Sequence, residues 1–474
     1  MTNLATIVDG HPDDAVAIVE GETKTTYAEL RARVAQLRGG LVRQEVQSGD
    51  RVALVLPNGL DFAAVYLAVL GVGAIAVPLN PTSPAPELAE EVGAIGARLS
   101  VADGAAIENA VTPASLTGGE EAEAVERADD DLAVLIFTAG TGGSPKAAML
   151  THGNLRANLE QIQRHPGREV GASDVTLGVL PLFHIFGLNV VLGLSLYTGA
   201  SVVMLDRFDP AGSLAAIAAN GVTVVAGAPP MYAAWARLAN ANPSALSGVR
   251  LALTGAAPLS EETRIAFETR FGVTLRQGYG LTEASPVVTS SVFDGAPRPH
   301  SIGVPLPGVD VRLVDDEGED ALVGDSGEIW VHGPNVFKGY WENDEATARA
   351  LTPDGWLRTG DVAVADDDGF LTIVDRAKDL IIVSGFNVFP AEVEDTLLEH
   401  PDVAEVAVVG VAHPHTGEAV KAFVVPEPGS SITESDVQAF CAGRLARYKC
   451  PATVTFVDAL PHGLAGKLLR RALR

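Results

Sequence analysis

Short apolar runs that favour β-strands alternate with alanine-rich amphipathic segments along about the first 370 residues of this chain. The runs cover residues 51–56, 74–77, 132–137, 175–179, 201–204, 222–225 and 249–253. Such alternation predicts parallel βαβ units, because two parallel strands need a crossover and a helix usually provides it. Residues 311–328 and 362–374 instead predict hairpins, with Asp-Glu-Gly and Asp-Asp-Gly turns. We therefore expect an α/β fold that changes from parallel to antiparallel order.

A shorter pattern of mixed strands and helices begins near residue 380. Runs at 380–383, 403–411, 419–425 and 453–457 predict strands, and segments at 391–400 and 433–445 predict helices. The chain of 474 residues is too long for one hydrophobic core. About 95 residues suffice for a separate domain. We therefore expect a large N-terminal domain and a small α+β C-terminal lid domain.

Charge and cysteine content restrict the classes of function. A formal net charge of −27 disfavours nucleic-acid and anionic-membrane surfaces, and it requires any ATP site to supply local cations. Cys441 and Cys450 show no metal-ligand pattern and fit reduced cytoplasmic thiols. The uncharged stretch 175–205 contains Pro181 and Asn189, so we expect buried strands and a helix there. These features predict a cytoplasmic protein without a secretory signal or an integral membrane segment.

Residues 138–146 form a run of hydroxyls and glycines directly after the predicted strand at 132–137. Glycines let backbone N–H groups turn toward an anion, and Lys146 adds a positive charge, so the run can hold phosphate. It is not a Walker loop, because Pro145 precedes the lysine and the spacing differs. On these residues alone, the alternative is a glycine-rich surface turn between a strand and a helix.

Four further places carry nucleotide-binding chemistry. Segment 278–283 places a tyrosine between two glycines, followed by a hydroxyl and a carboxylate, which suits a purine, a phosphate and Mg²⁺. Asp361 can accept both ribose hydroxyls, and Arg376 can donate to ribose or phosphate. Lys467 lies in a Gly/Ala stretch near the end of the chain. Taken singly, these residues also fit ordinary turns, salt bridges and tails.

Together and in this order, the motifs resemble those of the adenylate-forming (ANL) superfamily of acyl-CoA synthetases, luciferases and nonribosomal adenylation domains. The resemblance spans nearly the whole chain, through segments 26–30, 73–78, 138–146, 255–258, 279–283, 359–361 and 385–390. It implies the ANL fold, with parallel βαβ sheets and a β-barrel-like portion in an N-terminal adenylation domain at 1–375. A hinge at 376–378 and a mobile α+β C-terminal lid domain at 379–474 would follow.

The resemblance also implies roles, residue by residue. The β- and γ-phosphates of ATP would be held by Thr138, Thr141, Ser144 and Lys146. Adenine would be surrounded by Gly255, Ala256, Ala257 and Tyr279. Thr282 would touch the α-phosphate, Glu283 would hold Mg²⁺, and the ribose would be held by Asp361 and Arg376. Lys467 would lie between the substrate carboxylate and the α-phosphate, where attack needs positioning and charge neutralisation more than a general base.

In the family, a second reaction uses the same pocket. Lys378 would be the hinge about which the small domain rotates after adenylation. Rotation would withdraw Lys467 and bring the face containing Ser384, Gly385 and Phe386 to the site, where the thiol of CoA enters.

The acid indicated is apolar. Amino-acid-activating domains carry a Phe-Asp-x-Ser motif, but residues 183–187 here read Phe-His-Ile-Phe-Gly, so an amino acid would bury an unpaired cation. Segments 181–184 and 385–390 resemble the fatty-acid and aryl acyl-CoA synthetase branch, in which His184 would line the carboxylate or pantetheine side; a core histidine is the alternative. We expect a medium or long aliphatic fatty acid, with a 4-coumarate-type aryl acid as the alternative. CoA is the expected acceptor, a carrier protein is the alternative acceptor, and a homodimer is left open.

Several residues depart from the family pattern Thr-Ser-Gly-Thr-Thr-Gly-x-Pro-Lys-Gly. Ala139 and Gly142 each lack a hydroxyl, Ala147 replaces a glycine, and Ala465 replaces a threonine near Lys467. A neutral hydrogen bond is worth only about 0.5–1.5 kcal/mol net, so we expect weaker ATP binding and not inactivity.

Two other classes of protein fit less well. An NAD oxidoreductase is suggested by the glycines at 71–76, but they follow a helix-like segment and do not close a strand. A non-catalytic AMP-binding sensor would have no use for Glu283, Lys467 and the hinge.

Overall fold

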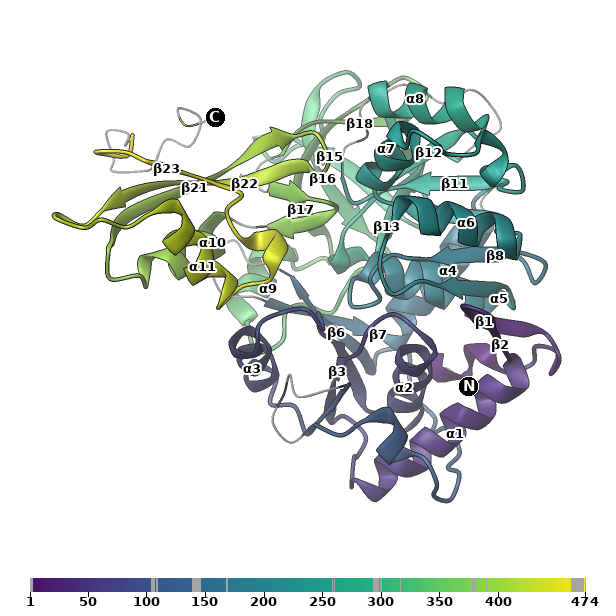
Figure 1. The fold of residues 1–474 in the computed structure, drawn as a ribbon. Coiled ribbons are helices and arrows are strands. Elements are labelled where there is room, and N and C mark those ends of the chain that lie inside the picture. The colour runs from purple at the N-terminus through teal and green to yellow at the C-terminus, as the bar shows by residue number, and fades with distance from the viewer. Residues whose placement is uncertain are drawn as a thin grey trace.

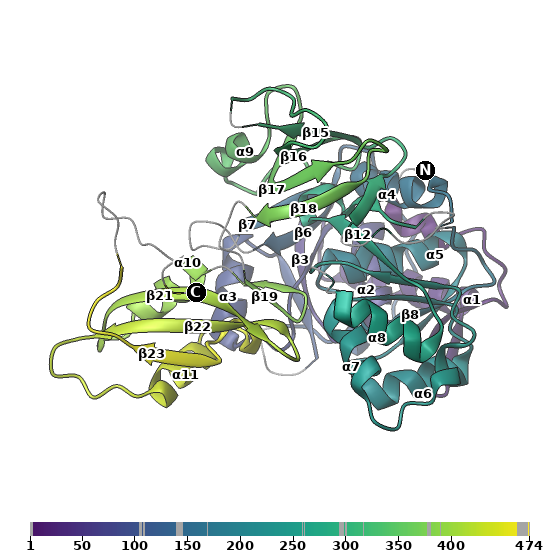
Figure 2. The same cartoon turned by 90° about the horizontal axis from the view of Figure 1, so that it is seen from above.

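A large and a small domain make up the molecule (Figures 1 and 2). The computed structural model describes residues 3–103, 107, 110–138, 146–167, 169–257, 259, 261–292, 298, 301–315, 317–376, 381–388, 390–461 and 473. Four candidate residues lie outside this part of the chain, namely Thr141, Ser144, Lys378 and Lys467, and so does the side chain of Arg376. The domain boundaries at 375 and 378 therefore remain a prediction.

The predicted alternation in the first 254 residues is confirmed, because each of the seven expected runs forms a strand within two residues of its predicted bounds. One sheet has the order β5-β3-β4-β6-β7 and is parallel except for β7. Its strands are β3 (Arg51–Val55), β4 (Ile75–Pro78), β5 (Leu99–Ala102), β6 (Leu132–Thr138) and β7 (Lys146–Thr151), and its crossover helices are α2 (Leu60–Gly71) and α3 (Ala85–Ala94).

The strand-to-helix turn considered for residues 138–146 is wrong. β6 is followed by the antiparallel strand β7, and the helix α4 (His152–Arg164) begins only after β7. The run of glycines and hydroxyls therefore stands between two paired strands. The backbone N–H and C=O groups of β6 and β7 form hydrogen bonds with each other, and this pairing holds Thr138 and Lys146 at the two ends of the run.

A second sheet extends through the rest of the large domain, in the order β2-β1-β9-β8-β10-β11-β12-β13-β14-β18-β17-β16-β15. It is parallel from β1 to β12 and antiparallel beyond, and both predicted hairpins form, as β15–β16 and β17–β18. The parallel part and its edge contain β1 (Val16–Glu20), β2 (Thr23–Thr26), β8 (Val175–Gly178), β9 (Ser201–Met204), β10 (Val224–Gly227), β11 (Leu251–Thr254) and β12 (Leu275–Gly280). The antiparallel part contains β13 (Val287–Ser290), β14 (Ser301–Pro305), β15 (Asp310–Val314), β16 (Ser326–His332), β17 (Leu357–Ala365) and β18 (Leu371–Arg376).

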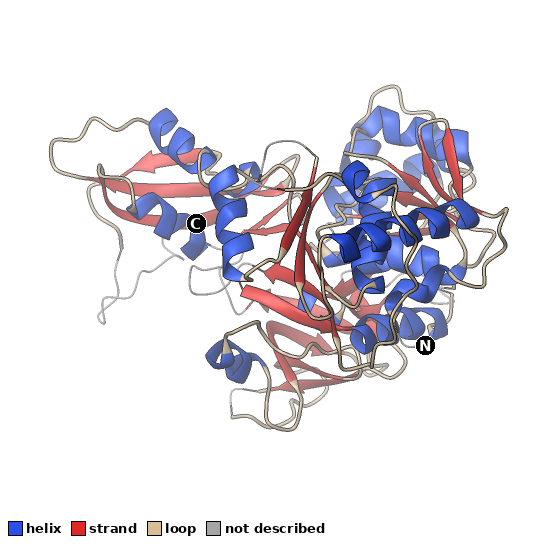
Figure 3. Cartoon of the chain, turned by 90° about the horizontal axis from the view of Figure 1, so that it is seen from below, coloured by secondary structure: helices blue, strands red, loops and turns tan. Residues whose placement is uncertain are grey.

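Helices pack around the strands of the large domain (Figure 3). They include α1 (Tyr27–Arg43), α6 (Pro210–Asn220), α7 (Pro229–Arg237), α8 (Glu261–Phe271) and α9 (Asp344–Ala350), with the 3₁₀ turns η1 (Leu4–Val8), η2 (Pro113–Leu116) and η4 (Pro243–Leu246). α1 and α4 each begin at a capping box, formed by Thr26 with Glu29 and by Thr151 with Asn154. The sequence therefore fixes where these helices start.

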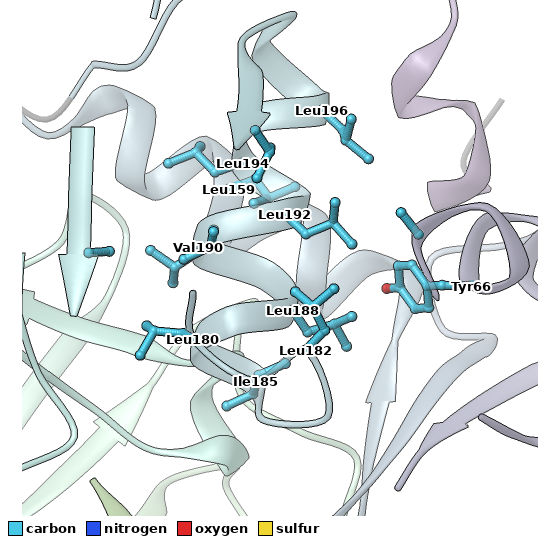
Figure 4. Packing of buried hydrophobic residues seen from close by; sticks show 14 of the residues in the cluster. Tyr66, Leu159, Leu180, Leu182, Ile185, Leu188, Val190, Leu192, Leu194 and Leu196 are labelled. Carbon is cyan, nitrogen blue, oxygen red and sulfur yellow. The ribbon is translucent and has the colours of Figure 1, made fainter. Parts of the chain in front are cut away.

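The uncharged stretch 175–205 is buried inside the large domain, as expected. It forms β8, the π-helix η3 (Phe186–Gly193), α5 (Leu194–Thr198) and β9, and its leucines pack with Leu159 and Tyr66 (Figure 4). The buried amide of Asn189 in this stretch is satisfied, because Nδ2 donates to the carbonyls of Leu155 and Ser285. Among the described residues, no helix combines the length and apolarity needed to cross a membrane.

The small domain has a sheet and a core of its own. Its sheet has the order β20-β19-β22-β21, and β23 pairs with β22. The elements are β19 (Ile381–Val383), β20 (Phe386–Val388), α10 (Pro390–Leu398), β21 (Val403–His413), β22 (Gly417–Pro426), α11 (Glu434–Ala442), η6 (Arg447–Lys449) and β23 (Thr453–Phe456). The predicted strands and helices after residue 380 are thus confirmed, whereas the short strand β20 was not expected.

Candidate functional site

The candidate adenine and ribose residues meet in the large domain. Tyr279 lies on β12 and Asp361 on β17, and Tyr279 Oη donates a hydrogen bond to Asp361 Oδ2 over 2.8 Å. Asp361 is the register partner of Arg376 in the β17–β18 pair. Its backbone N–H donates to Thr359 Oγ1 over 3.1 Å, so the Thr-Gly-Asp motif lies within β17 and is held there by its own side chain. Three motifs that are far apart in the sequence thus converge at one place.

The Gly-Ala-Ala turn lies beside this place. Gly255, Ala256 and Ala257 follow β11, which is parallel to its neighbour β12. Because Thr254 is the register partner of Gln277, the turn lies beside Tyr279 near the carboxyl ends of both strands. Ligands in α/β sheets bind at the carboxyl ends of strands. Ala256 has a φ of +65°, a left-handed conformation that side chains other than glycine rarely adopt. Such strain is found most often at functional sites.

The lysine that ends the glycine-rich run is the first residue of β7. Lys146 is the register partner of Thr138, whose Oγ1 donates to the Lys146 carbonyl over 3.3 Å. Lys146 Nζ lies 5.4 Å from the centre of the Tyr340 ring, within the range of a cation–π contact. Tyr340 is brought there by a β-bridge between Ala148 of β7 and Tyr340 itself.

The same tyrosine contacts the candidate metal ligand. Glu283 lies in the 3₁₀ turn η5 (Thr282–Ala284), and Tyr340 Oη donates to Glu283 Oε1 over 2.7 Å. The backbone N–H of Phe337 donates to the Glu283 carbonyl over 2.9 Å. Burial, and then the charge of Glu283, raises the pKa of Tyr340, so its hydroxyl stays protonated as a donor. Lys146, Tyr340 and Glu283 therefore form one connected group, with Thr282 next in sequence.

Tyr340 was not among the residues predicted from the sequence. Its local signal is an aromatic residue directly after a glycine, as at Tyr279. That signal is weak, because such a pair is also common in turns. The bridge to Ala148 and the contacts with Lys146 and Glu283 show that Tyr340 belongs to the site.

The described acidic, histidine and cysteine side chains form no cluster of three that could hold a metal ion. Mg²⁺ usually keeps several waters and takes one or two carboxylates together with substrate phosphates. Glu283, placed near the candidate phosphate lysine, fits an ion held in this way. It does not fit a metal held by protein ligands alone.

Residues of both domains line one pocket. It is lined by Leu180, Pro181, His184, Phe186, Ala228 and Ala256 from the large domain and by Ser384, Gly385 and Phe386 from the small domain. The structure thus brings the candidate CoA-side residues against His184 and the Gly-Ala-Ala turn. Among the described residues that line the pocket, none other than His184 is acidic or basic. A second charged group on the acid would find no counter-ion among them.

His184 is held in one orientation and one tautomer. The backbone N–H of Phe186 donates to His184 Nδ1 over 3.2 Å, so the neutral ring carries its proton on Nε2. Desolvation by burial lowers the pKa of His184 to about 4. The ring is therefore an uncharged donor at neutral pH, suited to a carboxylate or carbonyl oxygen in the pocket.

We expect His184 to stay neutral throughout the range from about pH 5 to 8. Folding lowers the pKa of His184, so protonation of the ring opposes the folded state. This group leaves the free energy of unfolding unchanged above its ordinary pKa of 6.5 and lowers it as the pH falls from there toward about 4. NMR titration of the ring proton signal, assigned by its loss in His184→Gln, measures this. A titration midpoint between pH 6 and 7 would show that the ring is solvated and that the lowered pKa is wrong.

Gly385 makes a close approach between the domains. Its φ is +86°, and a β-carbon added there would lie 3.0 Å from Ala228 Cβ. The preceding Ser384 has a φ of +52° and donates its backbone N–H to the Thr416 carbonyl over 2.9 Å. Glycine is required at 385 both for the backbone conformation and for the space.

We expect Gly385→Ala to slow thioester formation, the second reaction that the family resemblance implies, by about tenfold, because the added methyl displaces the small domain from the pocket. Gly369→Ala is the matched control, since Gly369 has a similar φ of +79° but no atom near the added methyl. The melting temperatures of both variants should fall by a similar small amount. Equal thioester rates in the two variants would contradict a role for the close approach.

Family models match most of this chain. The model of the AMP-binding enzyme matches residues 4–341, and that of the AMP-binding enzyme C-terminal domain matches residues 392–467.

The chain is also similar over its length to proteins of known name. A feruloyl-CoA synthase from Amycolatopsis sp is 40% identical, over 97% of this chain and 95% of its own. The long-chain-fatty-acid–CoA ligase of Bacillus subtilis (strain 168) is 35% identical, over 97% and 91%. A solved double mutant of o-succinylbenzoate CoA synthetase from Bacillus subtilis, bound with the product analogue OSB-NCoA, is 29% identical with a TM-score of 0.91, over 100% of this chain and 98% of that chain.

Proposed function

Since the chain belongs to the AMP-binding enzymes of the adenylate-forming superfamily and is an ATP-dependent acyl-CoA ligase, we propose that it activates an apolar monocarboxylic acid and transfers it to CoA. The first step gives acyl-AMP and pyrophosphate, and the second gives acyl-CoA and AMP. The observation that carries this proposal is the pocket shared by His184 and residues 384–386, with apolar walls.

In the first step, a carboxylate oxygen of the acid attacks the α-phosphorus of ATP, and the bond to pyrophosphate breaks. We assign phosphate binding to Thr138, Thr141, Ser144, Lys146 and Thr282, adenine binding to Gly255, Ala256, Ala257 and Tyr279, ribose binding to Asp361 and Arg376, and charge neutralisation at the reacting oxygens to Lys467. Glu283 would hold Mg²⁺, which would neutralise phosphate charge. The bond from Tyr279 to Asp361 would fix that carboxylate for the ribose hydroxyls.

In the second step, the thiol sulfur of CoA attacks the acyl carbon, AMP leaves, and the thiol proton is lost to solvent. Ser384, Gly385 and Phe386 line the pocket in the structure, which supports their assignment to this step. The similarity to the synthetase with bound OSB-NCoA supports this assignment, because a TM-score of 0.91 over the whole chain requires the two domains to have similar relative positions. The hinge role of Lys378 rests on the family resemblance alone.

We infer the substrate class from the pocket walls. Leu180, Pro181 and Phe186 are apolar, which favours an aliphatic or aryl acid over a dicarboxylate or an amino acid, because a second charge would find no counter-ion there. A fatty acid is the first candidate, as expected from the sequence. An aryl acid is the second, favoured by the 40% identity to a feruloyl-CoA synthase. The cytoplasmic location remains a prediction from composition.

Pyrophosphate release across a panel of acids tests the proposal. Octanoate, dodecanoate, 4-coumarate and ferulate are the test acids, and malonate and phenylalanine are the negative controls. Each is measured with and without CoA, and thioester is detected separately. We expect release only with the apolar acids and thioester only with CoA. Acyl-AMP that accumulates in the presence of CoA would indicate a carrier protein as the acceptor, and no release with any acid would favour the AMP-binding sensor.

A further inference from the structure

A buried ion cluster joins the two domains beside the pocket. Lys449 Nζ donates to Glu392 Oε1 over 2.8 Å and to Glu87 Oε1 over 2.9 Å. Lys449 and Glu392 belong to η6 and α10 of the small domain, whereas Glu87 belongs to α3 of the large domain, which lies next to the small domain (Figure 2). The three side chains are only 7–8% exposed.

The cluster is linked to the pocket by stacked rings. Tyr448, the neighbour of Lys449, stacks on Phe386 with ring centres 4.4 Å apart. Phe386 lines the pocket and also stacks on Phe183 of the large domain, at 6.2 Å. The position of Lys449 against α3 is therefore coupled to the position of Phe386 in the pocket.

The two ion pairs respond differently to a rotation of the small domain. Lys449 and Glu392 move together, so this pair persists in any orientation. Glu87 stays with α3, so its bond to Lys449 exists only when the small domain lies as in the structure. Buried charges are costly unless they are paired, and removing one partner is strongly unfavourable. A charge at position 87 thus favours one orientation without being needed for the fold of the small domain.

We propose that Glu87 is a positioning residue that holds the small domain, through Lys449, in the orientation that forms the thioester. The proposal rests on the two-step function proposed above. Glu87 touches neither acid nor nucleotide in this role. Its effect should therefore fall on the second reaction and not on the first.

Glu91 provides a matched control on the same helix. It lies one turn after Glu87, is 9% exposed, and its Oε2 has no hydrogen-bond partner. Burial, followed by the charge of Glu87, raises the pKa of Glu91 to about 8; Lys449, Glu392 and Glu90 are the other charged groups that face it. Glu91 is therefore largely protonated and neutral near pH 7, and glutamine at this position is neutral as well.

The experiment compares the two half-reactions in wild type, Glu87→Gln and Glu91→Gln at about pH 7. ATP–pyrophosphate exchange reports adenylation, and single-turnover transfer from preformed acyl-AMP to saturating CoA reports thioester formation. In Glu87→Gln we expect transfer to slow by about tenfold or more, with exchange unchanged or faster. In Glu91→Gln we expect both rates to stay within about twofold of wild type. Equal losses in both half-reactions, or no loss in either, for Glu87→Gln would overturn the proposal.

A second readout reports orientation without any substrate. In the orientation described, Ala228→Cys combined with Gly385→Cys places two β-carbons 3.0 Å apart, so the thiols can form a disulfide once the small domain has shifted slightly. The strain of a side chain at 385 is common to every variant of this series, so only differences between the variants are compared. Adding Glu87→Gln should lower the rate of this crosslink severalfold, and adding Glu91→Gln should not. If wild type made acyl-AMP but no thioester, the proposed function would fail. In that case, a crosslink rate that still depended on Glu87 would support the positioning role of Glu87. A crosslink rate independent of Glu87 would overturn that role as well.

Discussion

Replacing Lys467 by alanine is expected to slow acyl-AMP formation by about 10²–10³-fold, the usual loss when one charge-stabilising donor is removed from an active site. The carboxylate and the α-phosphate are both anionic, and the chain carries a net charge of −27, so a local cation is needed where they meet. Pyrophosphate release with the best acid of the panel measures this step.

Transfer to CoA should be spared in the same variant. In the proposed mechanism Lys467 is withdrawn from the site during the second reaction, so thioester formation from supplied acyl-AMP should stay within about threefold of wild type. Arg470→Ala is the control, because it removes a cation from the same basic tail without the proposed contact. A similar loss of adenylation in both variants would mean that the tail acts only through its overall charge.

The sequence was sufficient for most of the fold because alternation of strand and helix is a local property. The strands at 51–55 and 201–204 could be located from their apolar runs alone, since a buried parallel strand is apolar on both faces. Strand pairing is not local. The sequence therefore did not show that β7 pairs with β6 after the glycine-rich run, where a helix was considered. The short strand β20 was missed because three residues carry little pattern.

The same distinction applies to the site. Tyr279, Glu283 and Asp361 stand in short motifs whose residue types have a chemical reason, and the structure brings the first and third into a hydrogen bond. Tyr340 and Glu87 act through partners 57 and 362 positions away, which no short motif records. Long-range partners of this kind become visible only when the packing of the elements is known.

Replacing Glu283 by glutamine is expected to lower pyrophosphate release by about 10²-fold and to raise the Mg²⁺ concentration needed for half-maximal activity. Glutamine keeps the shape and an oxygen that can accept the bond from Tyr340 Oη, so the fold should be retained. It removes the negative charge, and Mg²⁺ strongly prefers anionic oxygen ligands. Titration with Mg²⁺ at saturating ATP, with the melting temperature as a check on folding, measures both effects.

Tyr340→Phe separates the metal role of Glu283 from its structural contact. This variant removes the hydrogen bond to Glu283 but keeps the carboxylate and the ring that faces Lys146. We expect a loss of at most about 10²-fold, because a net hydrogen bond to a charged group is worth about 1.5–3 kcal/mol. The Mg²⁺ requirement should be nearly unchanged, because the metal ligand remains. If Tyr340→Phe shifted the Mg²⁺ requirement as far as Glu283→Gln does, the bonded pair would be the ion-binding unit. If neither variant shifted it, Glu283 would serve the turn at 282–284 and the metal would be held by phosphate alone.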